Sequence, residues 1–488
     1  MEVCSTSTPD RTSISTFTSD DEYMIALYYW YIDIPTQCLD EHCTFHQEVC
    51  TNFQLFGRIR VSSEGLNGVL SGKATNLKLY EKRIRSEVEI KFRNVTCNSG
   101  ASSSLQYGET LDVKYCRLRK DIPLQKQLFN RLSIKVTKEV VSLHESTCMK
   151  KAQGSIGDDN GDDNDDDNTN GKESNYQSAK HLSPKEWNEH LLSYRSTGRP
   201  SNMDNKDASI DYVTNVGVGT LKGENTQPND DAILIDVRNI YESKIGYFSS
   251  ENIPTLLTNT RQYSSTIPVF KESIPHLAGK NVYMYCTGGV RCERASAYLQ
   301  ELADSTEWPD NLEKPKSIYQ LEGGIQKYLE TYGRFDGEDK FQITSDDREI
   351  KIKNEDMEHK MVASVEKIPE ICLYEGKNFV FDPRRIDPMV GSNNSIVGKC
   401  IICKTLCDDY DHNHAPSDHM ESRCCVCRVL VLVCNQCRQQ VRVWGQQQRD
   451  NGDVSLIPEL FCGPRGKECI QEGTIVEHFD IIHRNKVI

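Results

Sequence analysis

The sequence has no apolar run of the ~18 residues that a membrane-spanning helix requires. Residues 1–22 are rich in serine and threonine and contain no apolar core segment, so they do not resemble a secretory signal. Positive charge is not in excess either, because the formal net charge is −14 at pH 7. We therefore expect a disordered leader and a cytoplasmic protein without membrane association. The net charge gives no support to nucleic-acid binding by the surface as a whole and does not exclude it.

The charge is unevenly distributed along the 488 residues, a length that predicts two to four domains. Between Lys114 and Lys138 there are eight basic residues and one acid, Asp121. Between Asp158 and Asp167 there are seven aspartates, in a stretch too polar to form a core. On the residues alone, the basic stretch slightly favours a solvated face over phosphate contacts, and the acidic stretch predicts a disordered linker.

The first 150 residues alternate between strand-like and helix-like patterns. The order strand, helix, strand, strand, helix, strand predicts a small ferredoxin-like (acylphosphatase-like) α+β domain. The expected strands are Met24–Ile32, Gly57–Ser62, Val69–Ser71 and Leu132–Val141, the expected helices are Asp40–Asn52 and Thr75–Val88, and a turn is expected over Glu64–Gly68.

Short apolar strands alternate with helices further along the chain, which predicts an α/β domain with a parallel sheet and helices on both sides. Ser183 is the expected cap of the first helix, with Pro184 in its first turn. The expected strands are Ala232–Val237, Asn281–Tyr285 and Ser317–Leu321, and the expected helices are Lys185–Leu192 and Glu293–Leu302.

Cys286 follows one of these strands and precedes a helix, with two glycines between them. Glycines let backbone N–H groups turn inward, and a ring of such donors at a helix N-terminus stabilises an anion. A cysteine in that ring has a lowered pKa and is a nucleophile, and Arg291 would close the ring with a positive charge. The alternative is a small buried cysteine at a strand end. The loop that we expect to be active comprises Cys286, Thr287, Gly288, Gly289, Val290 and Arg291.

Cys292 directly follows Arg291 and has two interpretations: a resolving thiol, or a residue that packs the helix. We favour packing.

The chain has 20 cysteines, ten of them between Cys400 and Cys469. Without a secretory signal, such a pattern favours metal ligation over disulfides. Three C-x₂-C pairs and a fourth, wider pair could form two structural Cys₄ zinc sites in a zinc-ribbon-like tail. The favoured grouping is Cys400, Cys403, Cys424 and Cys427 for one site, and Cys434, Cys437, Cys462 and Cys469 for the other. An interleaved grouping is equally allowed, and unligated thiols or an iron–sulfur cluster are lesser alternatives.

Several segments together resemble the rhodanese-domain family whose bacterial members are the tRNA uridine hydroxylases, and its eukaryotic branch. The segments 57–61 and 64–68 resemble the family's N-terminal domain, and the segment 379–382 resembles the one that follows the rhodanese core. The rhodanese signature lies at 235–248 and includes Asp236 and Arg238 as structural residues. The active loop at 285–293 and the turn at 321–325 also match. The family's usual histidine is Tyr247 here.

The resemblance implies oxygen-dependent hydroxylation at C5 of the tRNA wobble uridine, with Cys286 as the essential cysteine and Arg291 lining the loop. Tyr247 and the extra insertions bear on the choice of substrate more than on the fold. Four residues between Cys286 and Arg291 suit a sulfur-centred anion, whereas phosphatases that reuse the rhodanese fold have five. Two other functions remain open: a sulfurtransferase that carries a Cys286 persulfide, and a zinc-bound interaction module with an idle rhodanese fold.

Together these observations predict a chain of six parts. They are a leader (1–22), a ferredoxin-like domain (23–145), an acidic linker (146–180), a rhodanese domain (181–345), a linker and extension (346–398), and a zinc-binding tail (399–488).

Overall fold

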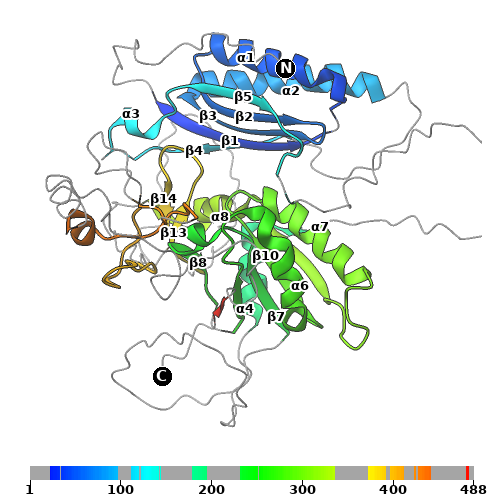
Figure 1. The fold of residues 1–488 in the computed structure, drawn as a ribbon. Helices are drawn as coiled ribbons and strands as arrows, with labels where there is room; N and C mark the ends of the chain where they lie inside the picture. Colours follow the sequence, from blue (N-terminus) through cyan, green and yellow to red (C-terminus); the bar gives the residue numbers. More distant parts are fainter. Residues whose placement is uncertain are drawn as a thin grey trace, which may run out of the picture.

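A five-stranded sheet carries the N-terminal part of the chain in the computed structural model (Figure 1). The structure describes residues 22–32, 34–96, 111–119, 122–141, 143, 179–194, 231–250, 252–335, 372–391, 396–410, 422–424, 427–440 and 480–482. The strand order is β4-β1-β3-β2-β5. The strands are β1 (Tyr23–Tyr31), β2 (Phe56–Ser62), β3 (Gly65–Lys73), β4 (Asp112–Cys116) and β5 (Leu132–Val136), and the helices are α1 (Leu39–Asn52), α2 (Ala74–Thr96) and the short α3 (Leu124–Gln127).

The first four strands in the order β4-β1-β3-β2 form the ferredoxin-like arrangement, but the strand expected to complete it lies at another place in the sheet. We expected Leu132–Val141 to be its last strand. Instead β4 takes that position beside β1, and the shorter β5 adds to the other edge, parallel to β2. The predicted turn over Glu64–Gly68 was also too long, because Ser62 already pairs with Gly65 and the strand resumes there.

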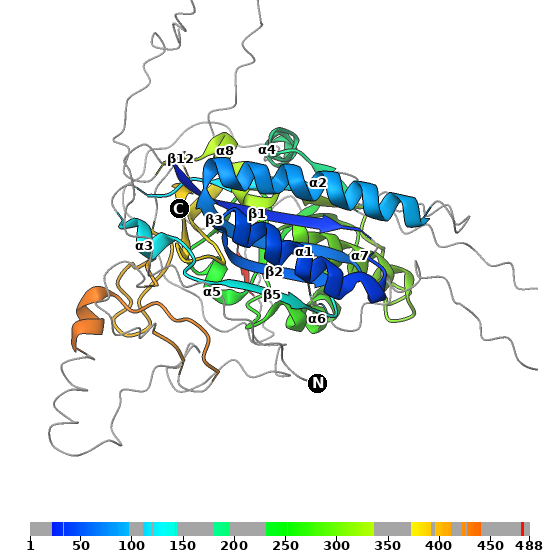
Figure 2. The ribbon, with the colours of Figure 1, turned by 90° about the horizontal axis from the view of Figure 1, so that it is seen from above.

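The two faces of this sheet have different partners. Alternate residues of β1, such as Tyr28 and Trp30, are buried in a core with residues of α1 and α2. Figure 2 shows both helices lying across that face. The residues between them, including Leu27 and Tyr29, therefore point to the opposite face, because successive side chains of a strand alternate. That face looks toward the second sheet (Figure 1).

The second sheet has the order β15-β9-β7-β10-β11-β6. Its central strands are parallel, and β15 joins the edge antiparallel to β9. The expected parallel sheet is therefore present, with one antiparallel edge strand. Its strands are β6 (Lys180–Leu182), β7 (Ala232–Asp236), β9 (Thr255–Leu257), β10 (Asn281–Tyr285), β11 (Ser317–Leu321) and β15 (Asp480–Ile482).

Helices cover both faces of this sheet, as expected. On one face Phe270 and Leu299, from α6 and α7, share a core with Met284 of β10. On the other face Trp187 and Tyr328, from α4 and α8, share a core with other residues of the same strands. The helices are α4 (Pro184–Ser193), α5 (Ile240–Ser243), α6 (Thr266–Leu277), α7 (Val290–Asp304) and α8 (Gly324–Tyr332). The predicted Ser183 cap is present, because its side chain accepts a hydrogen bond from the Glu186 amide.

A small sheet of order β12-β14-β13-β8 connects the second sheet to the cysteine-rich tail. The turn between β13 and β14 contains Phe381 and reaches the N-terminal sheet, since Arg58 of β2 donates a hydrogen bond to the Phe381 carbonyl oxygen. The strands are β8 (Gly246–Phe248), β12 (Arg334–Phe335), β13 (Tyr374–Phe379) and β14 (Ile386–Val390).

Among the described residues, every helix is too short or too polar to cross a bilayer.

Candidate functional site

Cys286 lies immediately after β10, in a loop that the N-terminus of α8 holds in place. The amides of Ile325 and Gln326 donate to the carbonyl oxygens of Cys286 and Thr287 over 2.9 and 3.1 Å. Gly324, at φ +67°, permits this approach, because a Cβ there would lie 2.6 Å from the Cys286 carbonyl oxygen. With the loop carbonyls turned toward α8, the following amides turn toward the cysteine.

Side chains and amides on that inner side stabilise the ionised form of the Cys286 thiol. The Gly289 amide donates to Cys286 Sγ over 3.2 Å, and Gly289 adopts φ +93° at the N-terminus of α7. Burial alone raises the pKa of the thiol. The Cys292 hydrogen bond, the Arg291 charge and the amides of both residues outweigh burial and lower the pKa from 9.0 to about 6. The thiol is therefore mostly thiolate at neutral pH.

Arg291 lies in the loop region as expected, but it contacts a carboxylate as well as supplying charge. Its guanidinium donates to both carboxylate oxygens of Glu242 over 2.7 and 2.6 Å. It also donates to Thr287 Oγ1 over 3.0 Å, and that hydroxyl donates to Glu242 over 3.0 Å. Glu242 is fully buried. This bidentate pair fixes the orientation of Arg291, so its charge acts on the thiolate from one position.

Cys292 packs as expected and also contacts the reactive sulfur. It is fully buried in the same core cluster as Cys286. Its thiol donates a hydrogen bond to Cys286, which helps to lower the Cys286 pKa. Burial, together with that hydrogen bond, raises the pKa of Cys292 well above its usual range. The two cysteines therefore form a thiol–thiolate pair with the charge on Cys286.

The open face of the N-terminal sheet lies directly over the loop. Tyr29 and Leu27 of β1 approach Gly288 so closely that a Cβ there would lie 3.2 and 3.4 Å from their side chains. Lys114 of β4 donates to the Gly288 carbonyl oxygen over 3.3 Å, and the hydroxyl of Tyr31 donates to the Val290 carbonyl oxygen over 3.4 Å. Two segments far apart in sequence thus enclose one site.

Cys286 is 0% exposed in this arrangement. Of the residues bordering it, Gly289 and Tyr29 are partly exposed. Substrate contact with the sulfur therefore requires the residues above the loop to move.

Asp236 and Arg238 form a fully buried ion pair one strand away. The guanidinium of Arg238 contacts both carboxylate oxygens of Asp236, at 2.9 and 2.7 Å, and the Gly246 carbonyl oxygen at 2.6 Å. The pair thus joins the end of β7 to the start of β8, so its contacts stabilise the fold.

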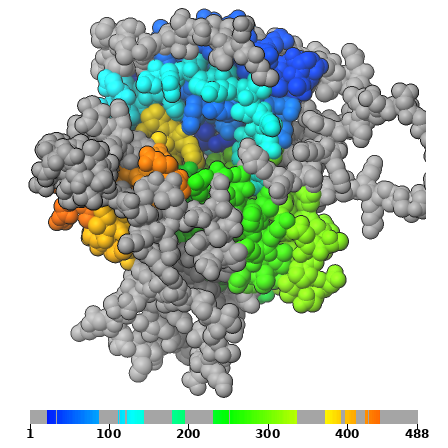
Figure 3. All heavy atoms as spheres, in the orientation of Figure 1, coloured from blue at the N-terminus to red at the C-terminus, as the bar shows by residue number. Residues whose placement is uncertain are grey.

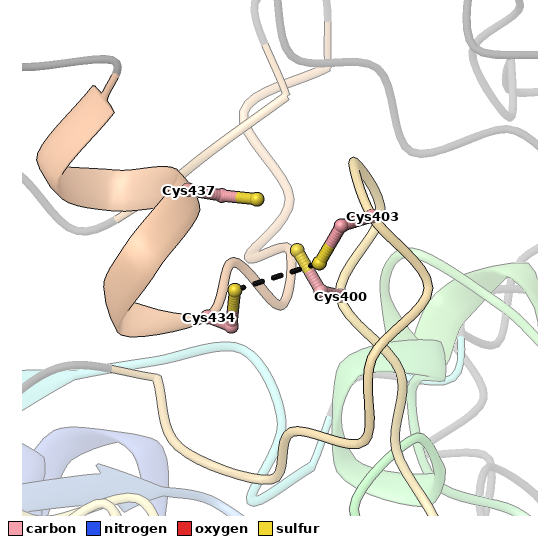
Figure 4. A group of neighbouring side chains, drawn as sticks. All are labelled: Cys400, Cys403, Cys434 and Cys437. Atoms are coloured by element: carbon pink, nitrogen blue, oxygen red, sulfur yellow. Dashed lines mark hydrogen bonds between the residues drawn. The ribbon is translucent and has the colours of Figure 1, made fainter.

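Four cysteines of the tail converge on one point, with all sulfur atoms within 4.8 Å of one another: Cys400, Cys403, Cys434 and Cys437. Figure 4 shows the first two on one loop and the last two at the start of a helix, residues 435–440 being helical. This is the interleaved grouping, so the favoured grouping of Cys400 and Cys403 with Cys424 and Cys427 was wrong. Spacing defines each pair but does not define which pairs meet.

The described residues around Cys424 and Cys427 share two backbone features with the turn at Cys400 and Cys403. The amides of Cys400 and Cys424 each donate a hydrogen bond to the carbonyl oxygen of the residue five positions later, over 2.8 and 2.9 Å. The carbonyl oxygens of the same two cysteines each accept one from the amide four positions later, over 3.0 Å. The residues after the second cysteines, Lys404 and Arg428, both adopt left-handed φ values of +65° and +63°. This pair therefore has the local shape of a ligand-bearing turn. Cys462 and Cys469, which the interleaved grouping leaves as its companions, lie outside the described residues.

The basic stretch between Lys114 and Lys138 divides into two kinds of residue. Lys114 is buried against the active loop. Arg117, Lys126, Arg131, Lys135 and Lys138 are exposed. Most of this stretch is thus a solvated basic face, and one member belongs to the loop's surroundings.

Sequence reasoning missed Tyr29 and Glu242 as neighbours of the active loop. Glu242 stands in the rhodanese-like signature three residues after Asn239, where its carboxylate accepts the Asn239 amide at 3.0 Å. That capping pattern could have marked its position. For Tyr29 the sequence indicates only which face of its strand it lies on, and nothing in it places that face over the active loop.

Two family models match the chain: the UPF0176 acylphosphatase-like domain over residues 23–140 and the rhodanese C-terminal domain over residues 375–447. The chain is 29% identical to the rhodanese-like domain-containing protein 6 of Arabidopsis thaliana, over 86% of this chain and 51% of that protein. The chain thus spans about half of that relative's length.

Bacterial relatives are matched over most of both chains. The tRNA uridine(34) hydroxylase of Cytophaga hutchinsonii is 25% identical over 79% of this chain and 80% of its own. That of Onion yellows phytoplasma is 25% identical over 84% of this chain and 89% of its own. The chain therefore contains an acylphosphatase-like domain and a rhodanese C-terminal domain, and it is similar over most of its length to tRNA uridine(34) hydroxylases.

Proposed function

We propose that this chain is an enzyme that modifies the wobble uridine of tRNA through the Cys286 thiolate, forming 5-hydroxyuridine. The observation that carries the proposal is the loop geometry, in which Cys286 Sγ accepts the Gly289 amide at 3.2 Å. The Cys292 hydrogen bond and the Arg291 charge support it, because they lower the pKa of Cys286 to about 6. The names of the bacterial relatives supply the substrate class.

The thiolate has two chemical uses in this proposal. It can add to C6 of the uracil ring and raise electron density at C5, or it can react with the oxidant first. Replacing C5–H by C5–OH is a two-electron oxidation of the base. We propose molecular oxygen as the oxidant: one oxygen atom enters C5 and the other leaves as water, and the two further electrons come from a pair of thiols that become a disulfide. Both uses require an ionised sulfur beside a positive charge, which Arg291 supplies.

The enclosed position of Cys286 adds a condition to this proposal. Because the sulfur is fully buried, Tyr29 and Lys114 above Gly288 must move before a base reaches it. A closed site excludes water from the reactive sulfur until substrate is bound.

We further propose that the four converging cysteines bind one structural zinc ion, and that the Cys424–Cys427 turn belongs to a second. Tetrahedral Zn–S bonds of ~2.3 Å place sulfur atoms about 3.8 Å apart. The Cys403 and Cys434 sulfur atoms lie 3.6 Å apart, which fits that geometry. Zinc would tie the Cys400 loop to the helix that carries Cys437.

The test of the function is nucleoside analysis of tRNA. Cells lacking the gene are complemented with the wild type, with Cys286→Ser, or with Cys43→Ser, whose half-buried thiol lies on α1. Mass spectrometry should find 5-hydroxyuridine restored by the wild type and by Cys43→Ser, and absent with Cys286→Ser.

Unchanged 5-hydroxyuridine in all strains, with thiosulfate-to-cyanide sulfur transfer that depends on Cys286, would instead establish a sulfurtransferase. If Cys286→Ser restores 5-hydroxyuridine as fully as the wild type, and the wild type transfers no sulfur, the chain acts without this thiolate. That result would favour the interaction module.

A further inference from the structure

Two arginines of β2 lie on the face of the N-terminal sheet that covers the active loop. Arg58 and Arg60 alternate with Ile59 and Val61, both fully buried in the core on the helical side. Arg60 of β2 pairs with Asn67 of β3, and Asn67 pairs in turn with Tyr29 of β1, so the three residues form one row across the sheet. Both guanidinium groups therefore belong to the same surface as the residue that packs on Gly288.

Arg58 connects this surface to the active loop through Phe381. Arg58 is exposed and donates a hydrogen bond to the Phe381 carbonyl oxygen. The Phe381 ring is 39% exposed, and its centroid lies 5.4 Å from the Arg291 guanidinium. Figure 3 shows the segment 372–391 (yellow) at the surface between the N-terminal sheet (blue and cyan) and the second sheet's layers (green). An exposed aromatic ring thus lies next to the site.

A third arginine joins this group. Arg58 is exposed at one end only, and the desolvation of its remaining part lowers its pKa; the charges of Arg60 and Arg385 lower that pKa further. The nearby carboxylate, Asp382, opposes that effect but is engaged by Arg384 at 2.9 and 2.6 Å. Among the described residues, Arg60 Nη1 is a buried donor without a hydrogen-bond partner. An anion at this place would relieve the repulsion and satisfy that donor.

The rim formed by Arg58, Arg60, Arg385 and Phe381 combines the two features that bind single-stranded RNA. Guanidinium groups bind phosphates in bidentate geometry, and exposed aromatic rings stack on bases. Acidic peptides would use the guanidinium groups alone, and nothing in them would use the ring. The ring beside the arginines therefore favours RNA over an acidic protein.

We propose that this rim holds the RNA strand at the site, with phosphates on Arg58, Arg60 and Arg385 and a base next to the target stacked on Phe381. The inference rests on the proposed function, because it identifies how that function's substrate is held. The rim lies where Tyr29 and Phe381 border the active loop. RNA bound there would place its target base beside Tyr29 and Lys114, the residues that must move to expose Cys286.

The experiment measures binding rather than modification. A fluorescent 17-nucleotide RNA stem-loop with a uridine in its loop is titrated with the full chain by anisotropy over a salt series. The variants are Arg58→Gln, Arg385→Gln and Phe381→Ala. Lys82→Gln, on the exposed side of α2, is the charge-matched control. Thermal melts confirm that each variant is folded.

The arginine and phenylalanine variants should differ in kind. Each arginine variant should weaken binding about fivefold and make the slope of log K against log[salt] shallower by about 0.7, the value for one single-strand phosphate contact. Phe381→Ala should weaken binding about tenfold and leave the slope unchanged, because stacking involves no counterion. Lys82→Gln should match the wild type.

Three outcomes would overturn the proposal: no binding by the wild type, wild-type affinity in folded rim variants, or displacement of the RNA by polyglutamate at equal charge with no effect of Phe381→Ala. The last would show a general anion surface. These outcomes are separate from failure of the proposed function, which is measured by 5-hydroxyuridine in cells. If the rim variants bind RNA weakly while Cys286→Ser cells keep normal 5-hydroxyuridine, the RNA-binding rim is supported. The proposed reaction at Cys286 is then contradicted.

Discussion

The Lys114 ammonium donates a hydrogen bond to the carbonyl oxygen of Gly288 over 3.3 Å, across 174 positions of sequence. A lysine of the N-terminal sheet thus holds the loop that carries Cys286. Lys114 is 8% exposed, so it contacts this loop instead of belonging to the solvated basic face around it. The contact makes the N-terminal sheet part of the candidate site.

Lys114→Met is expected to loosen the loop, because methionine keeps the apolar stem and leaves the Gly288 carbonyl without its donor. A hydrogen bond from a charged group contributes ~1.5–3 kcal/mol. The free energy of unfolding should fall by about that amount, and amide exchange at Gly288 and Gly289 should become faster. Lys135→Met, at an exposed position of β5, should change neither by more than ~0.5 kcal/mol. Equal exchange rates in the two variants would contradict the contact.

The ion pair of Asp236 and Arg238 is expected to stabilise the fold only while both members are present. Asp236→Asn leaves a buried guanidinium without its countercharge, which costs ~3–5 kcal/mol. Asp236→Leu combined with Arg238→Met removes both charges and should recover much of that loss. Chemical denaturation measures all three proteins. A double variant less stable than Asp236→Asn would show that the pair contributes more than charge compensation.

Removal of metal is expected to affect the tail through specific cysteines. Cys434→Ser should lower bound zinc, measured by mass spectrometry of the metal, by one equivalent per chain. Cys407→Ser is the matched control, because Cys407 lies outside the group of four and its thiol donates to the Asp409 carbonyl oxygen. Equal zinc in the two variants would exclude the site at Cys400, Cys403, Cys434 and Cys437.

The charge of Arg291 is expected to contribute to the ionisation of Cys286. Arg291→Met alone would leave the buried Glu242 carboxylate without its countercharge and could unfold the loop. The informative variant is therefore Arg291→Met combined with Glu242→Gln. Loss of the positive charge should raise the pKa of Cys286 above about 6 toward its usual value. Thiolate absorbance at 240 nm measures this shift, and an unchanged pKa would assign the ionisation to the amides and Cys292.

The parts of the fold that follow from local sequence were predictable. The apolar runs of β7 and β10 defined buried parallel strands, and Gly288 with Gly289 identified the loop beside them. The strand β4 was missed, because Asp112–Cys116 is short and carries Lys114 in the middle of a pattern that resembles a basic face. Its position beside β1 depends on tertiary pairing, which a local pattern does not contain.

The candidate site was predictable where it lies on one loop and unpredictable where separate segments meet. Cys286 and Arg291 are five positions apart, so one motif contained both. Tyr29 and Phe381 reach the same loop from opposite ends of the chain, and no spacing rule relates them. The cysteine pairs behave in the same way: x₂ spacing defined each pair, but the meeting of Cys403 with Cys434 depends on how the tail folds.

The central claim is that the Cys286 sulfur is ionised at neutral pH, and difference titration at 240 nm tests it most directly. The absorbance of Cys286→Ser is subtracted from that of the wild type between pH 4 and 10, which cancels the other thiols. A lowered pKa means that thiolate is lost as pH falls, so the account predicts one thiolate disappearing with a midpoint of about 6. A midpoint near 9, or no difference between the two proteins below pH 8, would contradict it.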